Sequence, residues 1–138
     1  MSVFTKAFYD TLIADTTLAA LLSEYGGVPA VFTAAPIPTD ASLPYIITEG
    51  DVGNLPFDTK VLRGREVIRD VRCYAIAEGS ADAVEDIAER VRTLFHNQSI
   101  PISGFNDSFL TEVSNILTAD EDGVYGRIVT VRLIAMEV

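Results

Sequence analysis

Residues 67–95 read VIRDVRCYAIAEGSADAVEDIAERVRTLF, and this stretch decides the fold. In its first half, polar and apolar residues alternate, which is typical of a half-buried strand. The alternation predicts a strand over 66–77. One face of that strand carries Val67, Val71, Cys73 and Ala75, and the other carries Ile68, Asp70, Arg72 and Tyr74.

The second half of the stretch predicts a helix over Ser80–His96. Its apolar residues recur at helical spacing and would form one continuous stripe. The stripe consists of Val84, Ile87, Ala88, Val91, Leu94 and Phe95. Acidic residues occupy the early turns and arginines the later turns, which suits the helix dipole.

The N-terminal region predicts two consecutive short helices. Ser2 is a plausible N-cap for a helix over Val3–Ala14, and Asp15 or Thr16 can cap a second piece. The second piece carries Leu18, Leu21 and Leu22 and ends at Gly26-Gly27.

The other strands are predicted from short apolar runs and turn residues. We expect strands near Val31-Phe32 and over Tyr45–Val52, and two closing strands over Phe109–Thr118 and Arg127–Glu137. The closing strands would be joined by a hairpin turn at Asp122-Gly123. Gly53–Gly64 shows no periodicity and is interpreted as a long exposed loop or hairpin arm, and His96–Asp107 as a loop.

The order of elements predicts the α+β class in a single domain, residues 1–138. Hairpins dominate, so we expect an antiparallel or mixed β-sheet of about four to five strands. Two main helices would pack on one face of this sheet. A chain of 138 residues can bury a core of this kind without a disulfide or a metal.

The charge of the chain argues against a nucleic-acid-binding surface. Its net charge is −10 at pH 7, and the ten basic residues are scattered. Binding to phosphates requires clustered Lys and Arg. The acidity fits either ordinary solubility or a surface that repels DNA. Apolar runs are too short to cross a bilayer, and we expect no membrane partner.

The residue types that could support catalysis or metal binding do not form a recognisable catalytic, cofactor or metal site. His96 is the only histidine and has no identifiable partner for general-base catalysis. Cys73 falls on the apolar face of a strand, which predicts core packing. Asp120, Glu121 and Asp122 lack the remaining ligands of a calcium loop and are interpreted as a solvated turn. We therefore expect a protein that is not an enzyme and binds no cofactor.

Two groups of apolar residues lack an evident internal partner and predict an interface. The first, Leu55, Phe57, Val61 and Leu62, lies in the Gly53–Gly64 segment. The second, on the outer face of the sheet, comprises Ile68, Tyr74, Ile76, Ile128 and Ile134, mixed with Asp70, Arg72 and Arg132. Such a mixture suits a protein–protein contact. Cover by the chain's own loops is the alternative.

Four stretches resemble one protein family. They are TLIADTTLAALL (11–22), VFTAAPIP (31–38) leading to LPYIITE (43–49), residues 67–95, and DGVYGRIVTVRLIAMEV (122–138). In this order and spacing the chain resembles the tail-terminator (tail-completion) proteins of siphovirus-type bacteriophages and phage-derived particles. Gly53–Gly64 and His96–Asp107 match the family poorly.

The resemblance implies a structural role in a virion or phage-like particle made in the bacterial cytoplasm. Such proteins form a ring, typically of six subunits, at the head-proximal end of the tail tube. The implied partners are other copies of the chain, the tail-tube protein and the head-completion (stopper) protein. DNA would pass through an acidic lumen without specific binding. Two alternatives remain: another ring protein of the head–tail neck or tail tube, and a small monomeric α+β ligand-binding module.

Overall fold

Two long antiparallel strands form the centre of a six-stranded sheet in the computed structural model, which describes residues 2–106, 108 and 110–138. They are β6 (Gly64–Ile76) and β8 (Val124–Met136), paired from Gly64↔Met136 to Ile76↔Val124. The flanking strands are β7 (Leu110–Thr118), beside β8, and β4 (Tyr45–Ile47) and β5 (Asp51–Pro56), which share the other edge of β6. A parallel strand, β3 (Val31–Phe32), borders β4 and makes the sheet mixed.

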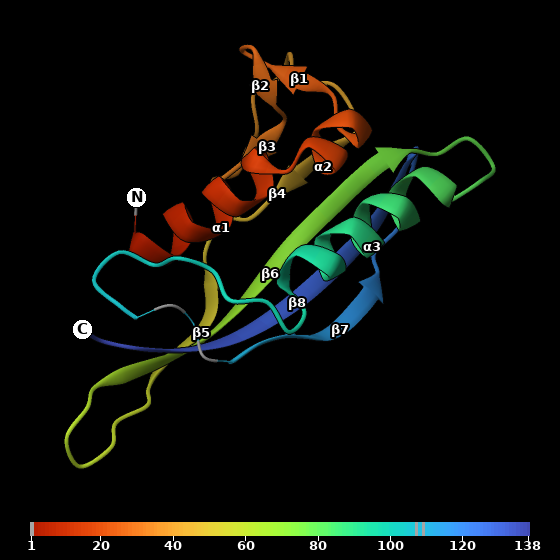
Figure 1. Cartoon of the computed structure of the whole chain (residues 1–138). Coiled ribbons are helices and arrows are strands. Elements are labelled where there is room, and N and C mark those ends of the chain that lie inside the picture. The colour runs from red at the N-terminus through yellow and green to blue at the C-terminus, as the bar shows by residue number, and fades with distance from the viewer. Residues whose placement is uncertain (1, 107, 109) are drawn as a thin grey trace.

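Three helices cover one face of this sheet (Figure 1). They are α1 (Val3–Ala14), α2 (Thr16–Leu21) and α3 (Asp82–Phe95). A small hairpin, β1 (Glu24–Tyr25) and β2 (Val28–Pro29), follows α2 around the two glycines that were expected only to end the helix. The predicted α+β class, with helices packed on one face of a mixed sheet, is confirmed.

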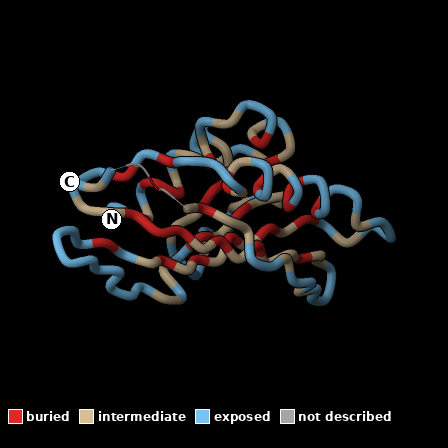
Figure 2. Tube along the Cα trace, turned by 60° about the horizontal axis from the view of Figure 1, so that its bottom comes forward, coloured by how far each residue is buried: buried red, intermediate tan, exposed pale blue. Residues whose placement is uncertain are grey.

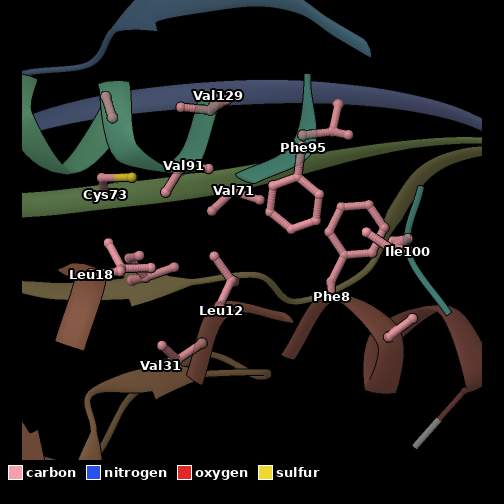
Figure 3. Close-up of a cluster of buried hydrophobic side chains, with 14 of the residues drawn as sticks. Phe8, Leu12, Leu18, Val31, Val71, Cys73, Val91, Phe95, Ile100 and Val129 are labelled. Carbon is pink, nitrogen blue, oxygen red and sulfur yellow. The ribbon is translucent and has the colours of Figure 1, made fainter. Parts of the chain in front are cut away.

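The core lies between the helices and the odd-numbered residues of β6. Figure 3 shows the Phe8 ring from α1 beside the Phe95 ring from α3, with Leu12 and Val71 in the same cluster. The Phe8 and Phe95 rings stack with centroids 4.9 Å apart. Each fully buried side chain of this size contributes roughly 1.5–3 kcal/mol relative to exposure. Strand alternation and helical periodicity therefore converge on one core.

Asp15 ties the two N-terminal helices to α3. Its carboxylate caps α2 by accepting from the Leu18 N–H at 2.8 Å. It also accepts two hydrogen bonds from the Arg90 guanidinium, at 2.8 and 2.7 Å. Arg90 in this way holds the pKa of Asp15 below its ordinary value. The predicted restart of the helix at Asp15 is confirmed, and its cause is partly tertiary.

The acidic segment between β7 and β8 is the predicted turn. Glu121 and Val124 exchange backbone hydrogen bonds of 2.9 and 3.1 Å around Gly123, whose φ is +76°. The Asp120 carboxylate accepts from the Gly126 N–H and from Arg127. This carboxylate is therefore committed to holding the hairpin.

The region 45–64 differs from its prediction in two ways. The strand expected over Tyr45–Val52 is interrupted after Ile47 and resumes as β5 at Asp51. The segment expected as a loop or arm is a hairpin arm, because β5 pairs with β6 as far as Pro56↔Arg65. Since β5 is largely exposed on both faces, its sequence has no reason to alternate, and periodicity could not reveal it.

Residues after α3 cover part of the outer edge of β7. The His96 Nδ1 accepts from the Val113 N–H at 3.1 Å, and the Asn97 N–H donates to the Thr111 carbonyl at 2.7 Å. Beyond this point β7 carries an irregularity between Val113 and Asn115. Asp107 and Phe109, the expected last residue of the loop and first residue of the strand, lie outside the described residues.

Candidate assembly surfaces

The hairpin arm ends in an exposed apolar tip, which we call the arm tip, residues 55–65. Leu55, Phe57, Val61 and Leu62 are all exposed, and Val61 retains 87% of its accessible surface. The tube in Figure 2 shows this hairpin as a long exposed stretch projecting from the body. Its backbone is nevertheless ordered, because Phe57 bonds to Gly64 at 2.9 Å and Thr59 to Leu62 at 2.8 Å.

The arm tip also carries positive charge without a carboxylate partner. Within the described ranges, Lys60, Arg63 and Arg65 form no ion pair, and Arg65 donates only to the Asn54 side chain at 3.2 Å. Elsewhere in the described structure, Lys6, Arg69, Arg90, Arg127 and Arg132 form ion pairs, whereas Arg72 and Arg92 do not. Asp58 lies in the arm but accepts from the Gly64 N–H. The arm tip is thus a basic element in a protein of net charge −10.

The helix-free face of the sheet does not form the single mixed surface that the sequence predicts. Ion pairs occupy its middle, where Arg132 contacts Glu66 at 2.8 Å and Glu112 at 3.3 Å. Next to them, Thr130 donates to Asp70 at 2.8 Å. Ile68 lies half-buried beside this polar ladder, since it pairs with Arg132. The ladder divides the face into two ends.

Ile134 does not belong to the exposed surface. It is only 4% accessible, although it lies on the predicted face and pairs with Glu66 and Leu110. The expectation that it is exposed there is wrong. Alternation along a strand specifies a face, but it does not specify how much of that face the chain's own neighbours cover.

The end of the face opposite the arm carries an apolar group, which we call the sheet patch. Ile76 and Leu117 retain 55% and 53% of their surfaces. The patch comprises these two residues with the half-buried Tyr45, Tyr74 and Ile128. The sequence analysis named Tyr74, Ile76 and Ile128 but missed Leu117. The irregularity after Val113 shifts the alternation of β7 and turns Leu117 to the same face as Ile128.

An aromatic row continues from the sheet patch across the neighbouring strands. Ring centroids lie 5.7 Å apart for Tyr74 and Tyr45, 6.0 Å for Tyr45 and Phe32, and 5.4 Å for Phe32 and Tyr25. These distances suit favourable edge and tilted contacts. Strand order aligns Tyr74, Tyr45 and Phe32 on β6, β4 and β3, and the separate β1–β2 hairpin adds Tyr25 at the end of the row.

Acidic residues border the sheet patch. Glu78 lies two residues after the end of β6, and the Ala77 N–H donates to the Gly123 carbonyl, which holds the acidic turn beside it. Glu121 from that turn is close enough to Tyr45 to contribute, after burial and Tyr74, to raising the pKa of its hydroxyl. In the part of the chain that the structure describes, Glu78, Glu121 and Asp122 form no ion pair.

Cys73 and His96, which were considered as catalytic candidates, are both engaged in the fold. Cys73 is fully buried, as predicted, and burial raises its pKa to about 12. The His96 imidazole is engaged by the backbone of β7. Among the described residues, no group of three or more His, Cys, Asp and Glu side chains could hold a metal ion. The helices described here include none that is long and apolar enough to span a bilayer.

An open groove of about 480 Å³ lies along α1. Its walls come mainly from aliphatic groups, including Ala7, Leu94 and Pro101. Of its carboxylates, Asp10 is paired with Lys6 and Asp15 with Arg90. It therefore lacks the convergent polar groups that fix a small ligand.

Comparison with known proteins shows a likeness of fold. No family model and no curated protein sequence matches the chain. Its fold is similar to that of a chain in the solved virion of a native gene transfer agent particle. The TM-score is 0.77 at 19% sequence identity, over 96% of this chain and 93% of that chain. The likeness establishes a shared fold over nearly the whole chain.

Proposed function

We propose that this protein is a structural component of a phage-derived particle, and that it acts there as a tail-terminator ring. The observation that carries the proposal is the near-complete fold likeness to a chain of a gene transfer agent virion. The resemblance of residues 11–49, 67–95 and 122–138 to tail-terminator proteins supports it independently.

The exposed surfaces are those that a ring requires. A closed ring is built from heterologous contacts, in which two different patches of each subunit meet. The arm tip and the sheet patch are different in character and lie at opposite ends of β6. The thirteen residues of β6 span about 40 Å from end to end, so one rigid element separates the two surfaces.

The proposed role explains the charge of the protein. A ring between the head and the tail tube must let DNA pass, and a net charge of −10 disfavours adhesion of a polyanion to its wall. The ring would contact the tail-tube protein on one side and the head-completion protein on the other. Another ring of the neck or tube is the closest alternative, because the same fold likeness supports it.

The decisive experiment combines the purified protein with polymerising tail-tube protein. We expect rings in electron micrographs, and tubes that stop growing once the protein is added. Labelling of particles should place it at the head-proximal end of the tail. A strictly monomeric protein that leaves tube length unchanged and is missing from particles would refute the proposal. Labelling elsewhere in the neck or tube would favour the alternative ring role.

A further inference from the structure

We propose that the arm tip of one copy docks on the sheet patch of a second copy. This inference rests on the proposed function, because it specifies the contact by which a ring would close. It pairs two surfaces that the sequence suggested only as separate contact regions.

Charge complementarity favours a second copy as the occupant. The arm tip presents Lys60, Arg63 and Arg65, and none of them has a carboxylate partner in the described structure. The sheet patch is bordered by three acids that also lack an ion pair there, Glu78, Glu121 and Asp122. Opposed charges around a contact fix its register and speed its formation.

The apolar parts of the two surfaces match as well. Leu55, Val61 and Leu62 are exposed on the arm tip, and Ile76 and Leu117 on the sheet patch. Tyr74 adds an aromatic surface of the kind that is enriched at interfaces. Basic residues surround the apolar centre of the arm tip, and acids border that of the sheet patch, where Arg72 beside Ile128 is the one basic neighbour among the described residues without an ion pair.

The fold prevents the arm tip from docking on its own patch. Both belong to one continuous hairpin and sheet, and the Gly64 and Ile76 ends of β6 lie about 40 Å apart. The arm leaves the sheet at the Gly64 end, whereas the patch lies at the Ile76 end (Figure 1). The contact must therefore be head-to-tail between copies, which propagates until it closes.

A charge-reversal cycle tests the pairing. The arm variant is K60E/R63E, the patch variant is E78K/E121K, and a third chain carries all four changes. The matched control, E89K/R92E, reverses charges on the exposed side of α3. Self-association is measured by sedimentation velocity at several salt concentrations, and rings are counted in electron micrographs.

We expect each double variant to associate about tenfold or more weakly than the wild type, while the control does not. The chain with all four changes should associate with an affinity within about threefold of wild type, because the charges on the two surfaces are again opposite. Wild-type association should weaken as salt rises. If the arm variant assembles as well as the control, or the chain with all four changes shows no recovery, the pairing is wrong.

Cross-linking gives a second readout that does not depend on charge. A mixture of Val61→Cys and Leu117→Cys chains should form disulfide-linked dimers on oxidation, whereas Val61→Cys mixed with a control, Ala83→Cys on α3, should not. The native Cys73 is buried and should not interfere. Rings without the expected cross-link would overturn the inference but not the proposed function, and a wild-type protein that forms no ring and is missing from particles would overturn both.

Discussion

Arg69 is the one fully buried arginine in the described structure, and replacing it should destabilise the fold strongly. Its guanidinium donates to the Thr48 hydroxyl at 2.7 Å, to the Thr48 carbonyl at 2.9 Å and to Asp51 at 2.9 Å. It also lies 5.4 Å from the centroid of the Phe8 ring. These contacts fill the gap between β4 and β5, where the strand is interrupted.

The cost of Arg69→Met follows from these partners. Hydrogen bonds to charged groups contribute about 1.5–3 kcal/mol each, and removing one partner of a buried pair typically costs about 3–5 kcal/mol. The Asp51 side chain is 18% accessible, so water can partly replace its lost partner. We therefore expect a loss of about 3–5 kcal/mol, or roughly 10–15 °C in Tm for a chain of this size.

Urea unfolding followed by circular dichroism measures this loss. Arg72→Met is the matched control, because Arg72 lies on the same strand but faces the other side, and it should change stability by less than about 0.5 kcal/mol. Hydrogen exchange should also show earlier opening of β5 in Arg69→Met. A loss below about 1 kcal/mol, with unchanged exchange in β5, would refute the argument that Arg69 holds the strand junction.

A cycle with Asp51→Asn separates the ion pair from the other contacts. Removing the carboxylate charge alone should cost about 2–3 kcal/mol, because the amide oxygen still accepts a hydrogen bond but the buried Arg69 guanidinium loses its counter-charge. The double variant should lose about 1–2 kcal/mol less stability than the sum of the two single losses, because it leaves no unpaired charge. Strict additivity would contradict a direct coupling.

Three further predictions concern other sites. Arg90 lowers the pKa of Asp15, so this pair should stabilise the fold fully above about pH 5 and progressively less as pH falls below about 4. The urea midpoints of wild type and Asp15→Asn should therefore converge at low pH. With its pKa raised to about 12, Cys73 should react with a thiol reagent at pH 8 only as fast as the protein unfolds, and labelling of the folded protein within minutes would contradict its burial. Gly64→Ala should lower stability by about 1–3 kcal/mol, because a Cβ would lie 2.5 Å from a backbone carbonyl and a methionine sulfur. Gly50→Ala, with open space around it, is the control for thermal unfolding.

The sequence was informative where one physical pattern dominates. Helix α3 and strands β6 and β8 carry apolar residues at clean spacing, and their boundaries were predicted within a few residues. Asp15 was one of two candidate caps, with Thr16, but its pairing with Arg90 joins residues 75 positions apart and has no local signal. The same limit applies to the aromatic row, which depends on strand order.

Two errors at the candidate surfaces have specific causes. Ile134 was assigned to an exposed face because alternation does not report local cover. Leu117 was missed because an irregularity in β7 reverses the alternation after Val113. Arg69 could have been noticed, since it falls among Val67, Val71 and Cys73 on the apolar face of its strand. A charge at such a position indicates a buried polar partner.

The edges of the sheet bear on how copies of this protein avoid aggregation. An open strand edge invites pairing with other chains and leads to fibres. Here one edge is the strand β3, which has only two residues. The edge formed by β5 is interrupted by its bulge and by its terminal Pro56. On the opposite side, His96 and Asn97 occupy backbone groups of β7. Because each edge is shortened, interrupted or partly covered, free subunits should resist edge-to-edge aggregation and join through side-chain contacts of defined geometry.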